Sequence, residues 1–250
     1  TEIIYELGAE NLIVGISGYT IRPERARKEK PKVSAFSTAK IDKILELKPD
    51  LVLGFSDIQS DICSTLIKKG INVLCFNQRS ISEILNVIKF LGKIIDKRDK
   101  SENYVQNLEI YLKKIASSSK RLNKKPRVYF EEWNDPMITG IKWVSELIEI
   151  AGGIDIFKNL SSEPLASDRI IQDPQDILNA NPDIIIASWC GKKVNKEKIK
   201  ARNKWDKIRA VQDNQIYEIK SPLILQPGPA ALTDGINEIQ NIIFRWKDSI

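Results

Sequence analysis

The sequence predicts an α/β protein made of two similar lobes, each with a mainly parallel sheet flanked by helices, joined by one long helix. Three observations support this prediction. Two sequence motifs occur twice in the same order, short wholly apolar runs follow Pro-Asp turns, and a long amphipathic segment without Gly or Pro separates the two copies.

The first repeated motif is an amphipathic helix that ends near a glycine. It reads TEIIYELGAENLIVG at residues 1–15 and SELIEIAGGIDIFKN at residues 145–159. Both copies begin with Ser or Thr followed by Glu. This order favours a helix N-terminus, because the side-chain oxygen can accept hydrogen bonds from the free amides of the first turn.

The second repeated motif combines a helix, a turn and a strand. It reads KILELKPDLVLGFSD at residues 43–57 and DILNANPDIIIASWC at residues 176–190. A continuous apolar strand bounded by turns is typical of a strand buried on both faces of a parallel sheet. Because the two motifs recur in the same order, we infer two homologous lobes.

The second copy of the repeat begins with a strand that has no counterpart in the first. RVYFEEW, residues 127–133, predicts a strand followed by a loop, shortly before the second copy of the helix motif. We therefore expect the full-length protein to carry an equivalent strand and loop before Thr1.

The segment between the copies predicts how the lobes are joined. Residues 101–123 place apolar side chains at helical spacing. A helix of this length spans about 33 Å, roughly the diameter of a small domain. We expect an N-terminal lobe at 1–100, a linking helix in 101–124 and a C-terminal lobe at 125–250, with only a small hinge closure between the lobes.

Composition narrows the class of protein. A hydrophobic content of 42% fits an ordinary globular protein, and no apolar run reaches the roughly 18 residues of a membrane-spanning helix. The net charge of +6 is concentrated in residues 23–32, 118–127 and 192–204. These runs lack interleaved aromatic residues, so we interpret them as solvated surface and expect no nucleic-acid partner.

The absence of histidine argues against catalysis. It excludes histidine-dependent nucleophile pairs and histidine-ligated metal sites. No phosphate-binding loop or dinucleotide fingerprint occurs either. We expect a binding protein with no catalytic residue, metal or cofactor. The alternative is a hydrolase that uses Glu131 and Glu132, adjacent acids in the loop after a strand, although acid/base pairs usually come from separate elements.

The three cysteines have no metal-like spacing, and their odd number allows at most one bridge within the chain. Cys63 lies in a helical pattern and Cys75 in a strand pattern, so we expect both to be small buried hydrophobic residues. We expect Cys190 to be structural or to line a ligand site, because no base accompanies it.

Four segments together resemble a known family over essentially the whole chain. They are TEIIYELGAENLIVGISGYTIRPE (1–24), KIDKILELKPDLVLG (40–54), SELIEIAGGIDIF (145–157) and NPDIII (181–186). The chain resembles the periplasmic substrate-binding proteins of ABC importers for cobalamin, haem and iron-siderophores, and it is most similar to the cobalamin-binding branch. The resemblance implies a small-molecule ligand. It also implies a periplasmic or membrane-anchored extracellular location, with the signal segment outside this sequence.

The resemblance further implies a partner, the permease of the transporter. Proteins of this family dock through one acidic residue on each lobe. The matching positions are Asp42 and Gln175, and beside the latter Asp176 supplies a carboxylate. We expect the protein to act as a monomer.

The ligand is expected beyond the carboxyl ends of the strands, where open α/β sheets bind their ligands. The resemblance places Tyr19 and Phe36 in the cleft. Trp133 and Trp189, at strand ends, each offer a flat apolar surface and one N–H donor, and Arg169 suits a carboxylate or phosphate. The expected ligand-binding residues are Tyr19, Phe36, Ser37, Phe55, Glu132, Trp133, Arg169, Trp189, Cys190 and Gln226.

The ligand that the resemblance implies is cobalamin or a related corrinoid. Arg169 and the paired glutamates make the expected cleft more polar than a plain cobalamin pocket. Two alternatives therefore stay open: a binding protein for another iron chelate or compact ring-containing polar solute, and a ligand-sensing module with the same fold.

Overall fold

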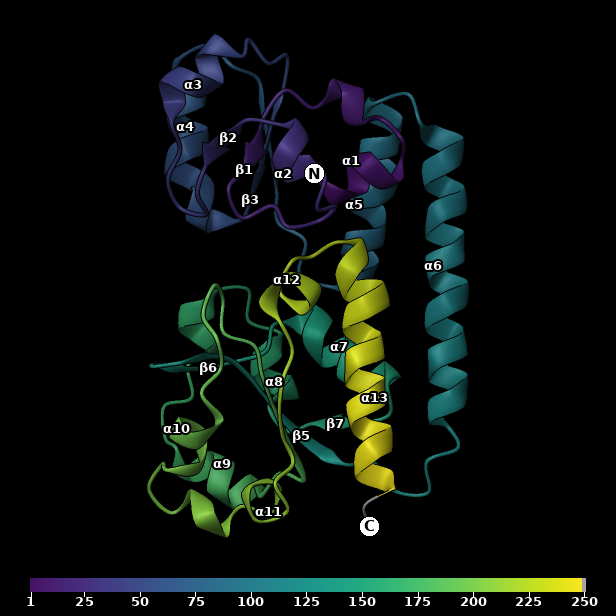
Figure 1. Ribbon diagram of the computed structural model, residues 1–250, viewed down its shortest axis with the longest axis vertical. Coiled ribbons are helices and arrows are strands. Elements are labelled where there is room, and N and C mark those ends of the chain that lie inside the picture. Colours follow the sequence, from purple (N-terminus) through teal and green to yellow (C-terminus); the bar gives the residue numbers. More distant parts are fainter. Residues whose placement is uncertain (249–250) are drawn as a thin grey trace. The chain divides into compact units, whose positions relative to one another are not determined.

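The chain folds into two compact units in a computed structural model that describes residues 1–248 (Figure 1). The N-terminal unit comprises Thr1–Gln78 and Ser82–Val105, and the C-terminal unit comprises Arg79–Ile81 and the chain from Gln106 onward. The two-lobed α/β prediction is confirmed by solved structures of the same fold, described below.

The N-terminal unit contains two pairs of parallel strands. Strand β1 (Ile16–Ser17) pairs with β2 (Lys32–Ser34), and β3 (Val52–Phe55) pairs with β4 (Val73–Phe76). The accompanying helices are α1 (Glu2–Glu6), α2 (Ala26–Glu29), α3 (Ile41–Glu46), α4 (Ser60–Lys68) and α5 (Ile81–Ile94), with 3-10 turns at Glu10–Leu12 and Asp57–Gln59.

Two burial predictions for this unit are wrong. Strand β3 is not buried on both faces, because Leu53 is 38% exposed and the strand pairs only with β4 among the described residues. Cys75 is exposed because β4 lies at the edge of its two-stranded sheet, whereas Cys63 on α4 is buried as expected.

The long helix α6 confirms the predicted helical segment and runs from Arg98 to Ser119, 22 residues. Its residues up to Val105 belong to the N-terminal unit and the rest to the C-terminal unit. In the C-terminal unit, Gln240 of helix α13 (Ile236–Lys247) donates to Ser118 Oγ of α6 at 2.9 Å. Of the six apolar side chains that the spacing selects on α6, Tyr104 and Tyr111 are half-buried, and the other four are buried: Val105, Leu108, Leu112 and Ile115.

The C-terminal unit is built on one five-stranded sheet, in which β5 and β8 are central. Strands β7, β5, β8 and β9 run parallel, and β6 pairs antiparallel with β5. The strands are β5 (Arg127–Asn134), β6 (Met137–Thr139), β7 (Ile154–Asp155), β8 (Ile184–Ala187) and β9 (Ile216–Glu218).

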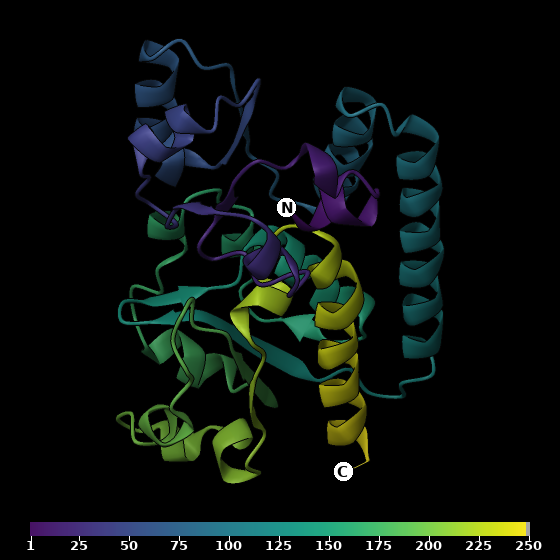
Figure 2. The ribbon, with the colours of Figure 1, turned by 45° about the horizontal axis from the view of Figure 1, so that its top comes forward.

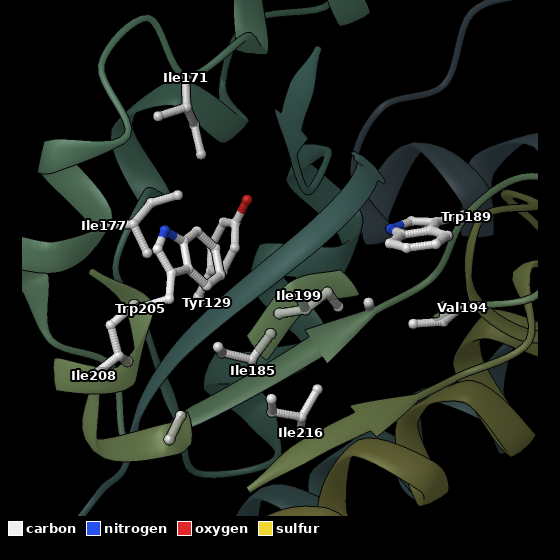
Figure 3. Close-up of a cluster of buried hydrophobic side chains, with 12 residues drawn as sticks. Tyr129, Ile171, Ile177, Ile185, Trp189, Val194, Ile199, Trp205, Ile208 and Ile216 are labelled. Atoms are coloured by element: carbon white, nitrogen blue, oxygen red, sulfur yellow. The ribbon is translucent and has the colours of Figure 1, made fainter. Parts of the chain in front are cut away.

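Helices cover both faces of this sheet. On one face α13, the yellow helix of Figure 2, packs against α7 (Lys142–Ile150). On the other face lies a cluster of buried hydrophobic side chains that includes Tyr129, Ile185 and Trp205 (Figure 3). The remaining helices are α8 (Lys158–Ser161), α9 (Gln175–Ala180), α10 (Lys196–Lys200), α11 (Arg209–Gln212) and α12 (Ser221–Ile224).

The internal repeat is visible in the backbone. Lys48 and Asn181 precede the two Pro-Asp turns, and both adopt a left-handed conformation, with φ of 46° and 43°. The capping prediction is wrong for both copies: Thr1 stands at the N-cap of α1 but makes no side-chain cap hydrogen bond, and Ser145 does not cap a helix. Helix α7 begins three residues earlier and buries Ser145, because the preceding chain continues its apolar face.

Within residues 1–248, none of the helices is both long enough and apolar enough to cross a lipid bilayer.

Candidate functional site: aromatic loops and paired charges at the strand ends

An exposed aromatic pair lies at the carboxyl ends of β1 and β2. Tyr19 and Phe36 meet edge to face, with ring centroids 6.3 Å apart and an interplanar angle of 64°. They are 48% and 37% exposed, so much of each ring faces solvent. Ser37 beside Phe36 is also exposed. Two of the predicted ligand residues are therefore brought together on one surface.

The Arg27 side chain holds the loop that carries Tyr19 by hydrogen bonds to its main chain. The Arg27 guanidinium donates to the carbonyl oxygens of Gly18, at 2.6 Å, and Thr20, at 2.8 Å, on either side of the tyrosine. The Tyr19 amide donates to Ser17 Oγ at 3.2 Å. Hydrogen bonds on both sides of Tyr19 therefore fix the backbone that carries its ring.

A second clamp connects Phe36 with Phe55, the half-buried residue at the end of β3. The Phe55 amide donates to Gln59 Oε1 at 2.8 Å, and Gln59 Nε2 donates to the Phe36 carbonyl at 2.9 Å. Sequence reasoning missed Gln59 and Arg27. Both act through main-chain atoms of other segments, and a side-chain pattern does not record such contacts.

In the C-terminal unit, Glu131 is the centre of a buried polar cluster. Its fully buried carboxylate accepts from the Tyr129 hydroxyl at 3.0 Å and from the Trp189 indole N–H at 3.1 Å. Arg202 donates two further hydrogen bonds to it, at 2.5 and 2.9 Å. A buried carboxylate is tolerated because its hydrogen bonds and ion pair are all supplied from within the unit.

This cluster gives Trp189 a place in the core. The side chain is 2% exposed, and its only donor is bonded to Glu131. Arg169 is buried to the same degree, so for both residues contact with a ligand stays a prediction. Trp205, which also packs in this core, is 1% exposed.

Glu132 has a different partner from its neighbour. Both glutamates lie inside β5, so their placement in a loop is wrong; successive side chains of a strand point to opposite faces. The Arg169 guanidinium donates to the two Glu132 oxygens at 2.7 and 3.3 Å and to the Thr139 carbonyl at 2.6 Å. Each carboxylate is neutralised by its own arginine.

The half-buried Trp133 lies at the end of β5, and the exposed Lys192 follows β8. Lys192 Nζ lies 5.5 Å from the ring centroid of Trp133 and 5.2 Å from that of Trp189. The ammonium also donates to Asn134 Oδ1 at 3.2 Å. Sequence reasoning missed Lys192, because it belongs to a basic run interpreted as solvated surface.

Cys190 is exposed, and Gln226 is half-buried, beyond α12. Although the residue as a whole is exposed, the protein partly covers its sulfur, and this burial raises the pKa of the Cys190 thiol. The nearby Glu132 carboxylate raises it further. The thiol therefore stays protonated at neutral pH, which does not suit a nucleophile.

The comparison with known proteins decides the family. The family described as "Periplasmic binding protein" matches residues 1–223. The chain belongs to this family. Its members are solute-binding proteins of ABC transporters and are not enzymes, so the predicted family and the binding rather than catalytic role are confirmed.

The chain is similar to individual periplasmic binding proteins over almost its whole length. It is 27% identical to the "Uncharacterized ABC transporter substrate-binding lipoprotein YvrC" of Bacillus subtilis, covering 98% of this chain and 77% of the relative. It is 25% identical to a "Vitamin B12-binding protein" of Vibrio cholerae, covering 96% and 84%. The structure of Staphylococcus aureus IsdE complexed with haem matches with a TM-score of 0.80 at 20% identity, covering 98% and 95%.

The positions predicted to dock on the transporter are exposed. Asp42 lies exposed in the first turn of α3, and Gln175 and Asp176 lie exposed in the first turn of α9. The Gln175 amide donates to Asp173 Oδ1 at 2.8 Å, so Asp173 caps this turn. Their contact with a permease stays a prediction.

Proposed function

We propose that this periplasmic binding protein is the extracytoplasmic subunit of a corrinoid importer, that it acts as a monomer, and that its ligand is cobalamin or a close relative. The observation that carries this proposal is the exposed aromatic pair Tyr19–Phe36, at the strand ends where α/β sheets bind ligands. Such rings bury large apolar areas against a ring-shaped ligand.

The hydrogen bonds that hold the aromatic loops support a binding role. Arg27 fixes the backbone on both sides of Tyr19, and Gln59 ties Phe36 to Phe55. A surface ordered before the ligand arrives loses less conformational entropy on binding, so more of the contact energy becomes affinity. In the C-terminal unit the proposed ligand residues are Glu132, Trp133, Arg169, Trp189, Cys190 and Gln226, with Ser37 and Phe55 added to the aromatic pair in the N-terminal unit.

A second candidate ligand is a haem-like ring that carries carboxylates. The Lys192 ammonium, held over the Trp133 ring beside the neutralised Glu132–Arg169 pair, favours a ligand with an anionic group. The relative whose structure contains haem makes this class worth testing beside corrinoids.

Replacing Tyr19 or Phe36 with alanine is expected to weaken corrinoid binding about 10- to 100-fold, because each change removes roughly 1.5–3 kcal/mol of apolar burial. Isothermal titration calorimetry with cobalamin, cobinamide and haem measures this. Phe90→Ala is the matched control. Phe90 is 46% exposed and makes its own edge-to-face contact with Phe76, and it is not among the proposed ligand residues. Its affinity should equal that of the wild type.

The calorimetry also separates the candidates. Heat with haem alone supports the second candidate, and absence of heat with either corrinoid excludes the first. Equal losses in Tyr19→Ala and Phe90→Ala would mean that the aromatic pair has no special part in binding.

Reversing charge at the docking positions is expected to impair transport without changing ligand affinity. Asp42→Lys and Asp176→Lys should each weaken association with the permease about tenfold, and more at low salt, because rim charges chiefly steer encounter. Uptake into proteoliposomes containing the transporter measures the effect. The control is Asp61→Lys, an exposed acid in the first turn of α4. Loss of ligand affinity in Asp42→Lys would contradict a pure docking role.

A further inference from the structure

Two cysteine sulfurs converge on one glycine in the N-terminal unit. Cys63 lies on α4, and Cys75 on β4 stands opposite Gly54 of β3 in the strand register. A methyl group placed on the Cα of Gly54 would lie 2.8 Å from Cys63 Sγ and 3.5 Å from Cys75 Sγ. A side chain at position 54 would crowd the Cys63 sulfur, so the glycine leaves room for that sulfur beside Cys75.

Both thiols can be reached by a small reagent. Cys75 is exposed, and together with the buried Cys63 it lines an open groove of about 560 Å³ along α4. None of the proposed ligand-binding residues lines this groove. The Cys75 thiol now makes two weak hydrogen bonds, to the Ser56 carbonyl at 3.7 Å and to the Phe76 carbonyl at 4.0 Å. Little would be lost if this sulfur turned towards Cys63.

We propose that Cys63 and Cys75 form a reversible disulfide that links α4 to β4. This inference rests on the extracytoplasmic location in the proposed function, because disulfides form and persist in that oxidising environment. Cys190 belongs to the other unit and keeps a free thiol, so the odd cysteine count is accounted for.

The chemistry is thiol–disulfide exchange with an external disulfide, small or protein-borne, as the oxidant. The Cys75 thiolate attacks one sulfur of that disulfide, forms a mixed disulfide and releases one thiol. The Cys63 thiolate then attacks Cys75 Sγ and releases the second thiol. Two protons and two electrons leave the protein, and the external disulfide is reduced to two thiols.

Burial raises the pKa of the Cys75 thiol, and the neighbouring Cys63 thiol and the Asp57 carboxylate raise it further. The attacking thiolate is therefore scarce at neutral pH. We expect bridge formation over minutes to hours, rather than the rapid exchange of a catalytic dithiol.

The test uses the Cys190→Ser chain equilibrated in a buffer of reduced and oxidised glutathione, then alkylated and measured by intact mass spectrometry. The expected result is a loss of two hydrogen atoms and a linked peptide pair containing Cys63 and Cys75. The oxidised protein should also melt at least 4 °C higher than the same sample reduced with a phosphine. Cys63→Ala and Cys75→Ala should show neither change.

Two results would overturn the proposal: both thiols alkylated after oxidation, or glutathione attached to Cys75 alone. If Cys63→Ala folds poorly, Cys75→Ser serves as the variant that cannot form the bridge. Cys75 is exposed, so this substitution should not disturb the core. Ligand titrations of the wild-type protein are independent of this readout. A missing bridge would therefore leave the corrinoid proposal intact, and the reverse also holds.

Discussion

Joining one extra strand ahead of Thr1 is expected to stabilise the N-terminal unit by about 1–2 kcal/mol, or roughly 4–8 °C in melting temperature for each kcal/mol. The gain is expected because the added strand buries apolar surface and completes hydrogen bonds with its neighbours, which together outweigh the conformational entropy lost when it is ordered.

The strand pairings of the two units are the reason for this expectation. In the C-terminal unit β5 lies between β7 and β8 and pairs in parallel with both. The repeat matches β8 with β3, and β7 follows helix α7 as β1 follows helix α1. Among the described residues of the N-terminal unit, β1 pairs with β2, β3 pairs with β4, and no strand joins the two pairs. The place that β5 takes in one unit has no described strand in the other.

Two pairs of matched residues show how the missing strand pairing changes burial. Asp183 after the second Pro-Asp turn is buried, and its carboxylate accepts from the Arg127 amide that begins β5. The matching Asp50 is exposed. Three residues further along, Ile186 is fully buried, whereas the matching Leu53 is 38% exposed. An added strand would cover Leu53 and offer Asp50 an amide to bond.

A tractable extension copies residues 127–144, which stand before Ser145 as the added segment would stand before Thr1. Thermal unfolding and the hydrogen exchange of the Leu53 amide measure the effect. The control carries the same extension with proline at the positions copied from Val128 and Phe130. Proline has no amide hydrogen to donate to a neighbouring strand, so this extension should not pair. If both extended chains unfold like the parent, the N-terminal unit has no place for the strand.

Removing the charge of Arg202 is expected to destabilise the C-terminal unit by about 3–5 kcal/mol in the free energy of unfolding. Arg202→Met leaves the Glu131 carboxylate buried without its cation, and an uncompensated buried charge carries a penalty of this size. The Arg202 side chain is itself only 19% exposed, so water replaces little of what it provides.

Urea unfolding followed by tryptophan fluorescence measures this loss, because Trp189 donates to the same carboxylate. The matched control is Lys200→Met. Lys200 forms a surface ion pair with Glu197, whose side chain is 80% exposed. This pair should contribute about 1 kcal/mol or less to stability. Adding Glu131→Gln to Arg202→Met should recover part of the stability. Equal costs for Arg202→Met and Lys200→Met would mean that the buried pair is not a structural anchor.

The fold was predictable from the sequence where the signal is local. The repeated helix, Pro-Asp turn and apolar strand are periodic patterns within about 15 residues, and the left-handed Lys48 and Asn181 occupy matching places in the structure. The α6 helix was predictable for the same reason, because its apolar stripe lies within one segment. The half-exposed β3 was not, because its sequence is as apolar as that of β8 and its burial depends on which strands pair with it.

The sequence by itself determined the two-lobed α/β class, the family and the loops at the strand ends, because each depends on residue types in chain order. Only the tertiary structure decided what individual side chains in those loops do. It placed Trp189 in the core through a carboxylate 58 residues away and neutralised Glu131 with an arginine 71 residues away. It also clamped the exposed aromatic loops with Gln59, 23 residues from the carbonyl it binds. Such contacts depend on distance in space, and no pattern along the chain encodes them.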